Sequence, residues 1–226
     1  MQEALPCAAT DAWLCLDWVG DHTDEIGAAL RQHVELTVVA VVIGMLISAP
    51  LSLVAWRHKR AGAAILSVTG ILYTIPSLAL FGLLIPFTGL TFQTAEIALV
   101  GYTLLVIIRN VLAGLEGVPD DVRESARGMG LTPTQQLLRV EIPLALPTIF
   151  AGIRSATVTT IGLVTITSLI TLGGLGNLIL DGLRRDFRTP LVVGSVLSLA
   201  LAVVADLLLV GLQRLLTPWA RGAAAG

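Results

Sequence analysis

Charged residues are scarce in this sequence. They make up 13% of its 226 residues, whereas a typical soluble domain carries about 25%. Uncharged runs cover residues 36–56, 61–95, 155–180 and 189–205, and a helix needs roughly 20 apolar residues to cross the hydrocarbon core of a membrane. The composition therefore excludes an ordinary soluble domain and predicts an all-α integral membrane protein.

Motifs of catalytic chemistry are also missing. The sequence has no GxxxxGK[ST] phosphate-binding loop, no HExxH zinc motif and no GxSxG nucleophile elbow. None of its three histidines stands at metal-ligand spacing from a cysteine. We predict no catalytic residue, no metal site, no cofactor in this chain and no enzymatic activity.

The cysteines are few and lie at one end. Cys7 and Cys15 both precede the first long uncharged run, in an acidic segment that also holds Trp13 and Trp18. If this segment is extracytoplasmic, the two thiols have the opportunity to pair; two free thiols are the alternative. The segment lacks the basic start of a signal peptide.

The distribution of positive charge predicts the orientation. The densest cationic cluster, Arg57-His58-Lys59-Arg60, contains the only lysine of the chain, and cytoplasmic loops carry the excess of such residues. We predict five spans, at about residues 33–56, 63–85, 94–113, 144–170 and 190–212. With the cationic cluster in the cytoplasm, the N-terminus lies outside and the C-terminus inside. We expect an extracytoplasmic tail at 1–32, a transmembrane domain at 33–213 and a cytoplasmic tail at 214–226. Arg184, Arg185 and Arg188 would then lie outside, against the rule.

One long polar segment, Asp121 to Pro147, interrupts the apolar sequence. It contains two predicted helix starts, a capping box at Asp121 and Glu124 and another from Thr132 to Gln135. Val122, Ala126 and Met129 share one face of the first short helix. Such a helix is too short to span a membrane and suits a surface or the groove of a partner.

The spacing of residues in this segment resembles the cytoplasmic EAA loop of permease subunits of ABC importers of type I. Glu124-Ser125-Ala126, Gly130 and Pro143 keep the family's spacing, with Ser125 in place of the middle alanine. The resemblance implies that the loop at about residues 114–143 docks on a separate ATPase subunit. The residues to which it assigns this coupling are Glu124, Ser125, Ala126, Arg127, Gly128, Met129, Gly130 and Pro143. An ordinary amphipathic connector is the alternative.

Further segments resemble the osmoprotectant branch of these importers: residues 74–80, 102–110, 127–130, 143–147 and 173–176. The resemblance implies import of a quaternary amine such as glycine betaine, choline, carnitine or proline betaine across the cell membrane of a prokaryote. It also implies three protein partners: an ATP-binding cassette subunit that holds ATP and magnesium, a second permease subunit and an extracytoplasmic solute-binding protein. A permease for methionine or another amino acid is the nearest alternative. A secondary transporter is disfavoured because no internal repeat is present.

Three features suggest a translocation path. Hydroxyls and Arg154 fall on one face of the fourth span, which suits either a wetted path or close helix packing. A glycine-rich segment after that span suits either an outer gate or a plain turn, and Pro76 predicts a kink in the second span. The candidate path and gate residues are Tyr73, Thr74, Pro76, Ser77, Thr157, Thr160, Thr167, Ser168, Leu172, Gly173 and Gly174.

Two charges inside predicted spans require partners. Asp206 and Arg109 lie near the cytoplasmic ends of the fifth and third spans, where a charge is less costly than at the centre of the membrane. We expect Asp206 to pair with Arg109 or with Arg154, and Glu96 to lie at the outer interface.

Overall fold

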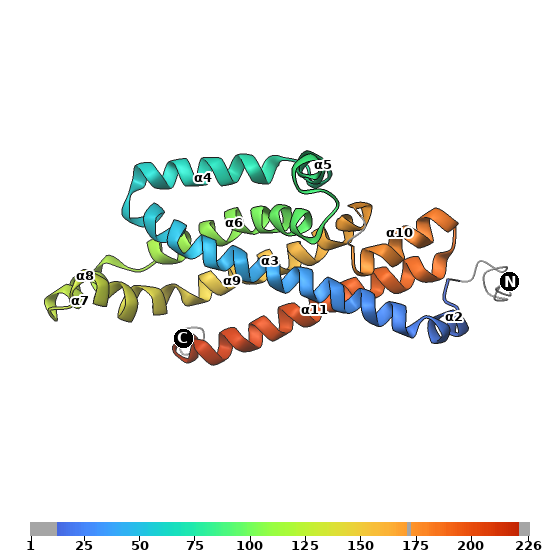
Figure 1. Ribbon diagram of the computed structural model, residues 1–226. Helices are drawn as coiled ribbons and strands as arrows, with labels where there is room; N and C mark the ends of the chain where they lie inside the picture. Colours follow the sequence, from blue (N-terminus) through green and yellow to red (C-terminus); the bar gives the residue numbers. More distant parts are fainter. Residues whose placement is uncertain (1–12, 171–172, 222–226) are drawn as a thin grey trace. The chain divides into compact units, whose positions relative to one another are not determined.

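Helices are the only regular secondary structure in the described part of the computed structural model, which comprises residues 13–170 and 173–221. Figure 1 labels the main helices. In chain order the elements are α2 (Leu16–Asp21), α3 (Thr23–Arg57), α4 (Lys59–Thr74), α5 (Ser77–Thr88), α6 (Phe92–Glu116), α7 (Asp120–Gly128), α8 (Pro133–Gln136), the π-helix η1 (Leu137–Glu141), α9 (Ile142–Ile166), the 3₁₀ helix η2 (Thr167–Ile170), α10 (Leu175–Arg185), α11 (Arg188–Leu216) and the 3₁₀ helix η3 (Pro218–Arg221).

Four helical segments are long and apolar enough to cross a membrane. They are α3, α6, the continuous segment Pro133–Ile170 and α11. The pair α4 and α5 passes the same test when it is taken together as one bent span. The count of about five spans is therefore confirmed.

By their contacts the residues form two compact units. Of the described residues, unit 1 comprises 13–41, 75–100, 158–170 and 173–204, and unit 2 comprises 42–74, 101–157 and 205–221. The long helices α3, α6, α9 and α11 contribute residues to both units. Each unit has its own core.

The first long helix begins earlier than the hydropathy of the sequence predicts. α3 starts at Thr23 instead of residue 33, and α2 precedes it, so residues 16–32 of the expected tail are largely helical. Asp24 and Glu25 occupy the first turn of α3, where negative charge interacts favourably with the helix dipole. Cys15 is disulfide-bonded; Cys7 lies outside the described residues.

The predicted kink at Pro76 is a break between two helices. α4 ends at Thr74 and α5 starts at Ser77, with Pro76 as the N-cap residue in an extended conformation (φ −56°, ψ 135°). A proline disfavours the helical conformation of the residue before it, which accounts for the end of α4. α5 continues beyond residue 85, the predicted end of the second span, because Pro86 lies inside the helix; the residue with positive φ that follows the helix is Gly89 (φ 70°).

Unit 1 contains a buried cluster around a tryptophan. Cys15, Trp18, Leu175 and Leu178 form its buried cluster. The Trp18 ring stacks on His22 at a centroid distance of 4.3 Å. Glu96, which we expect at the outer interface of the membrane, has a buried side chain in this unit: it is 6% exposed, and neither carboxylate oxygen has a hydrogen-bond partner among the described residues.

Unit 2 is built from closely approaching helices. Ala55, Ile108 and Leu112 form one buried cluster, and a second one lies around Leu137. A Cβ atom at Gly114 of α6 would lie 3.0 Å from the Ala145 carbonyl oxygen of α9, so glycine permits the small helix separation that membrane packing favours. Asp206 pairs with Arg154, the second of the two expected partners, and not with Arg109.

Candidate functional site

The polar segment folds into the short helix α7 of unit 2. α7 begins at Asp120, and its N-cap is Pro119 without a side-chain cap. The capping box predicted at Asp121 and Glu124 was therefore wrong, because the fixed φ of Pro119 starts the helix before Asp121. Asp120 and Asp121 instead occupy the first turn, where their charges favour the positive end of the helix dipole.

The end of α7 explains the glycine at position 130. Gly130 is left-handed (φ +79°), its N–H donates to the Arg127 carbonyl at 2.9 Å, and the Leu131 N–H donates to the Ala126 carbonyl at 3.2 Å. These two bonds form a Schellman motif, which requires a left-handed residue at this position. Gly130 thereby sets the length of α7.

Arg123 fixes α7 to the rest of unit 2. Its Nη2 atom donates to the Leu115 carbonyl at 2.6 Å, and its Nε atom donates to Glu141 Oε1 at 3.3 Å. The same Glu141 oxygen accepts from Gln136 Nε2 at 2.7 Å, and the Glu141 side chain is only 2% exposed. Breaking the ion pair between a buried carboxylate and an arginine is costly, because it leaves a buried charge without a partner. Arg123 therefore connects α7 to the end of α6 through Leu115 and to η1 through Glu141.

Most other residues of α7 and of its C-terminal end are exposed. Ala126 is buried at 1%, but Met129 is 72% exposed, because Met129 follows the last helical residue. Of the three residues predicted to share an apolar face, only Ala126 packs fully inside. The exposed residues of the predicted coupling set are Glu124, Ser125, Arg127, Gly128, Met129 and Gly130.

The second predicted helix start is confirmed. Thr132 caps α8: the Gln135 N–H donates to its hydroxyl, and the Gln135 side chain accepts from the Thr132 N–H. The π-turn η1 follows and ends two residues before Pro143. Proline lacks an N–H and its ring clashes with the carbonyl of residue i−4, here Arg139, so a wider turn accommodates it. Pro143 is partly buried and has this structural role.

The hydroxyl face of the fourth span is buried within the chain. Thr157, Thr160, Thr167 and Ser168 are 8%, 1%, 0% and 9% exposed. The hydroxyls of Thr157, Thr167 and Ser168 donate to carbonyls three or four residues earlier, which satisfies them without water. This burial favours packing over the lining of a path.

The glycine segment of unit 1 also packs closely. The Gly174 N–H donates to Gln32 Oε1 at 3.1 Å, and a Cβ at Gly174 would lie 2.8 Å from the Cα of His33. A Cβ at Gly173 would overlap the backbone of Ser168. These glycines let the segment contact α3 and η2. Leu172, predicted beside them, and Thr171 lie outside the described residues.

Tyr73 and Thr74 are accessible. They line a cavity of about 520 Å³ in unit 2, together with Leu66, Ser67, Gly70, Ile71, Leu105 and Arg109. The ring of Tyr73 lies edge-on to that of Tyr102 at 5.9 Å. Pro76 and Ser77 belong to unit 1, where Pro76 is exposed and Ser77 half-buried.

Sequence reasoning did not identify the anchor of α7. Arg123, Gln136 and Glu141 are brought together by the chain turning back after α7. The available signal was a pair of opposite charges eighteen residues apart on either side of the exposed motif.

Similarity to known proteins defines the class of this chain. Residues 37–221 match the model of the family described as binding-protein-dependent transport system inner membrane component, and the chain belongs to this family. It is therefore a membrane component of a transport system. In the described residues, no group of histidine, cysteine, aspartate and glutamate side chains forms a metal site.

The named relatives are transport permeases. The osmoprotectant import permease protein OsmW of Salmonella typhimurium is 40% identical over 203 residues, covering 88% of this chain and 94% of that protein. The choline transport system permease protein OpuBB of Bacillus subtilis is 39% identical over 187 residues, covering 83% of this chain and 86% of that protein.

Solved structures share the fold. The MetNI methionine ABC transporter in an inward-facing conformation gives a TM-score of 0.73 at 23% identity, covering 83% of this chain and 94% of that chain. An amino acid ABC transporter with histidines gives 0.74 at 20% identity, covering 88% and 97%. At these identities the likeness concerns the fold alone.

Proposed function

We propose that this chain is the permease subunit of an ATP-driven importer for quaternary-amine osmoprotectants, such as glycine betaine, choline, carnitine or proline betaine. The observation that carries the proposal is the relationship to OsmW, an osmoprotectant import permease that is 40% identical over 88% of this chain. A permease for methionine or another amino acid remains the rival, but the two solved amino acid transporters that share the fold are only 23% and 20% identical to this chain.

The exposed surface of α7 is the proposed docking site for a separate ATPase subunit. Glu124, Arg127 and Met129 offer a charge of each sign and a flexible apolar side chain on a helix that is anchored through Arg123. An anchored helix transmits a displacement to the helices that hold it, whereas a loose loop absorbs it. ATP and magnesium would be held by that ATPase subunit, and this chain would hold no cofactor.

The remaining assembly follows from the same proposal. α7 and the Arg57–Arg60 cluster would face the cytoplasm, and the N-terminus would lie outside. Two permease subunits would form the path, and an extracytoplasmic binding protein would deliver the solute. Binding of ATP would shift the population between inward-open and outward-open states.

The test is uptake into vesicles that contain the permease, its ATPase subunit and its binding protein. We expect ATP-dependent uptake of labelled glycine betaine or choline, lost in Glu124→Ala and in Arg127→Ala while the complex still assembles. Thr134→Ala, an exposed change on α8, is the control. Uptake of methionine alone would move the substrate class, and uptake that does not depend on ATP would overturn the importer itself.

A further inference from the structure

A second polar cavity lies in unit 2, at the ends of three helices. It has a volume of about 630 Å³ and is lined by Ala55, Trp56, Lys59, Gly62, Ala63, Leu66, Leu112, Glu116 and Arg123. Trp56 is the penultimate residue of α3, Lys59 is the first of α4 and Glu116 is the last of α6. None of the predicted path residues lines this cavity, although Leu66 also lines the cavity of Tyr73 and Thr74.

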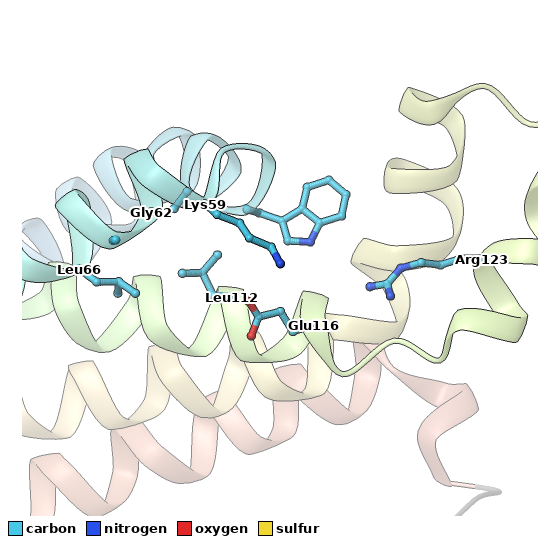
Figure 2. A pocket seen from close by; sticks show the side chains of 9 residues that line it. Lys59, Gly62, Leu66, Leu112, Glu116 and Arg123 are labelled. Carbon is cyan, nitrogen blue, oxygen red and sulfur yellow. The ribbon is translucent and has the colours of Figure 1, made fainter.

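Two opposite charges face this cavity without meeting. Figure 2 shows Lys59 pointing into it from α4 and Glu116 from α6. Neither Lys59 nor Glu116 takes part in a salt bridge of 4.0 Å or less with another described residue. Arg123 lines the opposite side, but its guanidinium is already bonded to Leu115, Asp120 and Glu141. The free charges of the cavity are therefore one ammonium and one carboxylate.

The rest of the lining is mostly apolar and aromatic. Leu66, Leu112 and Ala63 cover one part, and the indole of Trp56 covers another. Methyl groups on a positive nitrogen bind favourably against an indole face and a carboxylate, and a carboxylate binds to an ammonium through charge-assisted hydrogen bonds. A small molecule that carries both groups satisfies both free charges at once.

We propose that this cavity binds a small zwitterion with a methylated ammonium and a carboxylate, the chemistry of the betaine-type solutes assigned to the importer above. The inference rests on that proposed function for the identity of the solute and on this cavity for the site. The carboxylate contacts Lys59, and the ammonium lies between Trp56 and Glu116.

Arg123 connects the cavity to α7. The same side chain lines the cavity and holds α7 to Leu115 and Glu141. A ligand that binds the arrangement in which Arg123 is docked stabilises that arrangement. Occupied cavities therefore hold α7 in place, which gives an accumulated solute an influence on coupling.

The experiment is equilibrium binding of labelled glycine betaine to the full-length permease in nanodiscs, without ATPase subunit or binding protein. We expect Lys59→Gln and Glu116→Gln each to weaken binding about tenfold. Lys59→Gln removes a charged hydrogen-bond donor to the ligand carboxylate, and Glu116→Gln removes the negative charge that attracts the methylated ammonium. Arg60→Gln removes a neighbouring exposed charge that does not line the cavity and should leave binding unchanged. If Lys59 and Glu116 serve only each other, both substitutions leave binding unchanged, and the proposal is overturned.

A second pair of variants tests the volume instead of the charge. Ala63 lines the cavity and Ala64 does not, and both are exposed on α4. Ala63→Trp should abolish binding and Ala64→Trp should not; equal binding by both overturns the site.

Competing ligands identify the chemistry. Glycine betaine should displace the label far better than choline or acetate, which each carry one of the two groups. Glycerophosphocholine, which represents a lipid headgroup, should compete weakly, and stronger competition by it would overturn the solute as occupant. Uptake by the complete importer is measured separately. If the wild-type chain supports uptake of glycine betaine but binds none of it in nanodiscs, this site is refuted and the proposed function stands.

Discussion

Arg154 and Asp206 form a two-point salt bridge between α9 and α11. Arg154 Nε lies 2.8 Å from Asp206 Oδ1, and Arg154 Nη2 lies 2.9 Å from Asp206 Oδ2. Both side chains are 32% exposed. The paired geometry uses the planar fork of arginine, and it offsets two charges within segments that are long and apolar enough to cross a membrane.

Removing one member of this pair should destabilise the permease. Asp206→Asn leaves the Arg154 guanidinium without its counter-charge, and Arg154→Gln does the same to Asp206, so both should lower the melting temperature in detergent. The exchange of Arg154→Asp with Asp206→Arg in one chain should recover part of the loss, because the opposite charges face each other again. A double variant that is less stable than either single one would show that the pair is not the cause.

Gly130 should tolerate alanine worse than Gly128 does. A Cβ meets nothing within 4 Å at either position, but only Gly130 has a positive φ. Gly130→Ala should therefore cost about 1 kcal/mol through backbone conformation alone, whereas Gly128→Ala, inside α7, should gain up to about 1 kcal/mol. Thermal unfolding of the two variants measures the difference, and equal stability would contradict the Schellman ending of α7.

The two carboxylates on Arg123 should contribute unequally. Glu141 is 2% exposed and Asp120 is 88% exposed. Glu141→Gln should destabilise α7 by about 1.5–3 kcal/mol, the range for hydrogen bonds to charged groups, and Asp120→Asn by about 0–1 kcal/mol. Hydrogen exchange of the α7 amides measures both, with faster exchange expected in Glu141→Gln. The same protection in both variants would mean that Glu141 does not anchor the helix.

The spans and the exposed motif were predictable from sequence because they depend on local properties. A span is recognised from the length and composition of one apolar run, and the Thr132 cap involves two residues three apart. The Asp121 cap failed where another local constraint, Pro119, acted first. The break after Thr74 differs from the expected kink because Pro76 takes an extended conformation.

The contacts within each unit were less accessible. Helical periodicity places Thr157 and Thr160 on one face, but it does not say whether that face meets water or another helix, and both are buried. Arg123 and Glu141 meet only once α7 and α8 have folded. Close approach at Gly174 likewise involves α3, about 140 residues earlier in the sequence.

Gly174 should be indispensable to packing in unit 1. Its φ is +48°, and a Cβ would lie 2.8 Å from His33 Cα. Gly174→Ala should therefore cost about 3 kcal/mol, at the upper end for overpacking. Gly162→Ala on α9, where a Cβ meets nothing within 4 Å, is the control. Comparable melting temperatures for the two variants would show that the segment yields readily, as a gate would.

Substitutions at Tyr73 and Thr157 distinguish residues that line the translocation path from residues that only pack between helices. Thr157 is 8% exposed, and its hydroxyl donates to the Ile153 carbonyl of the same helix. Thr157→Val keeps the shape, so we expect uptake at the wild-type rate. Tyr73 is 38% exposed and lines a cavity with Arg109, so Tyr73→Ala should slow uptake while assembly persists. Initial rates of labelled glycine betaine uptake give the comparison. If Thr157→Val lowers the uptake rate while the stability of the protein is unchanged, the hydroxyl face lines the translocation path. The variant would then have lost only a polar group that contacts the solute.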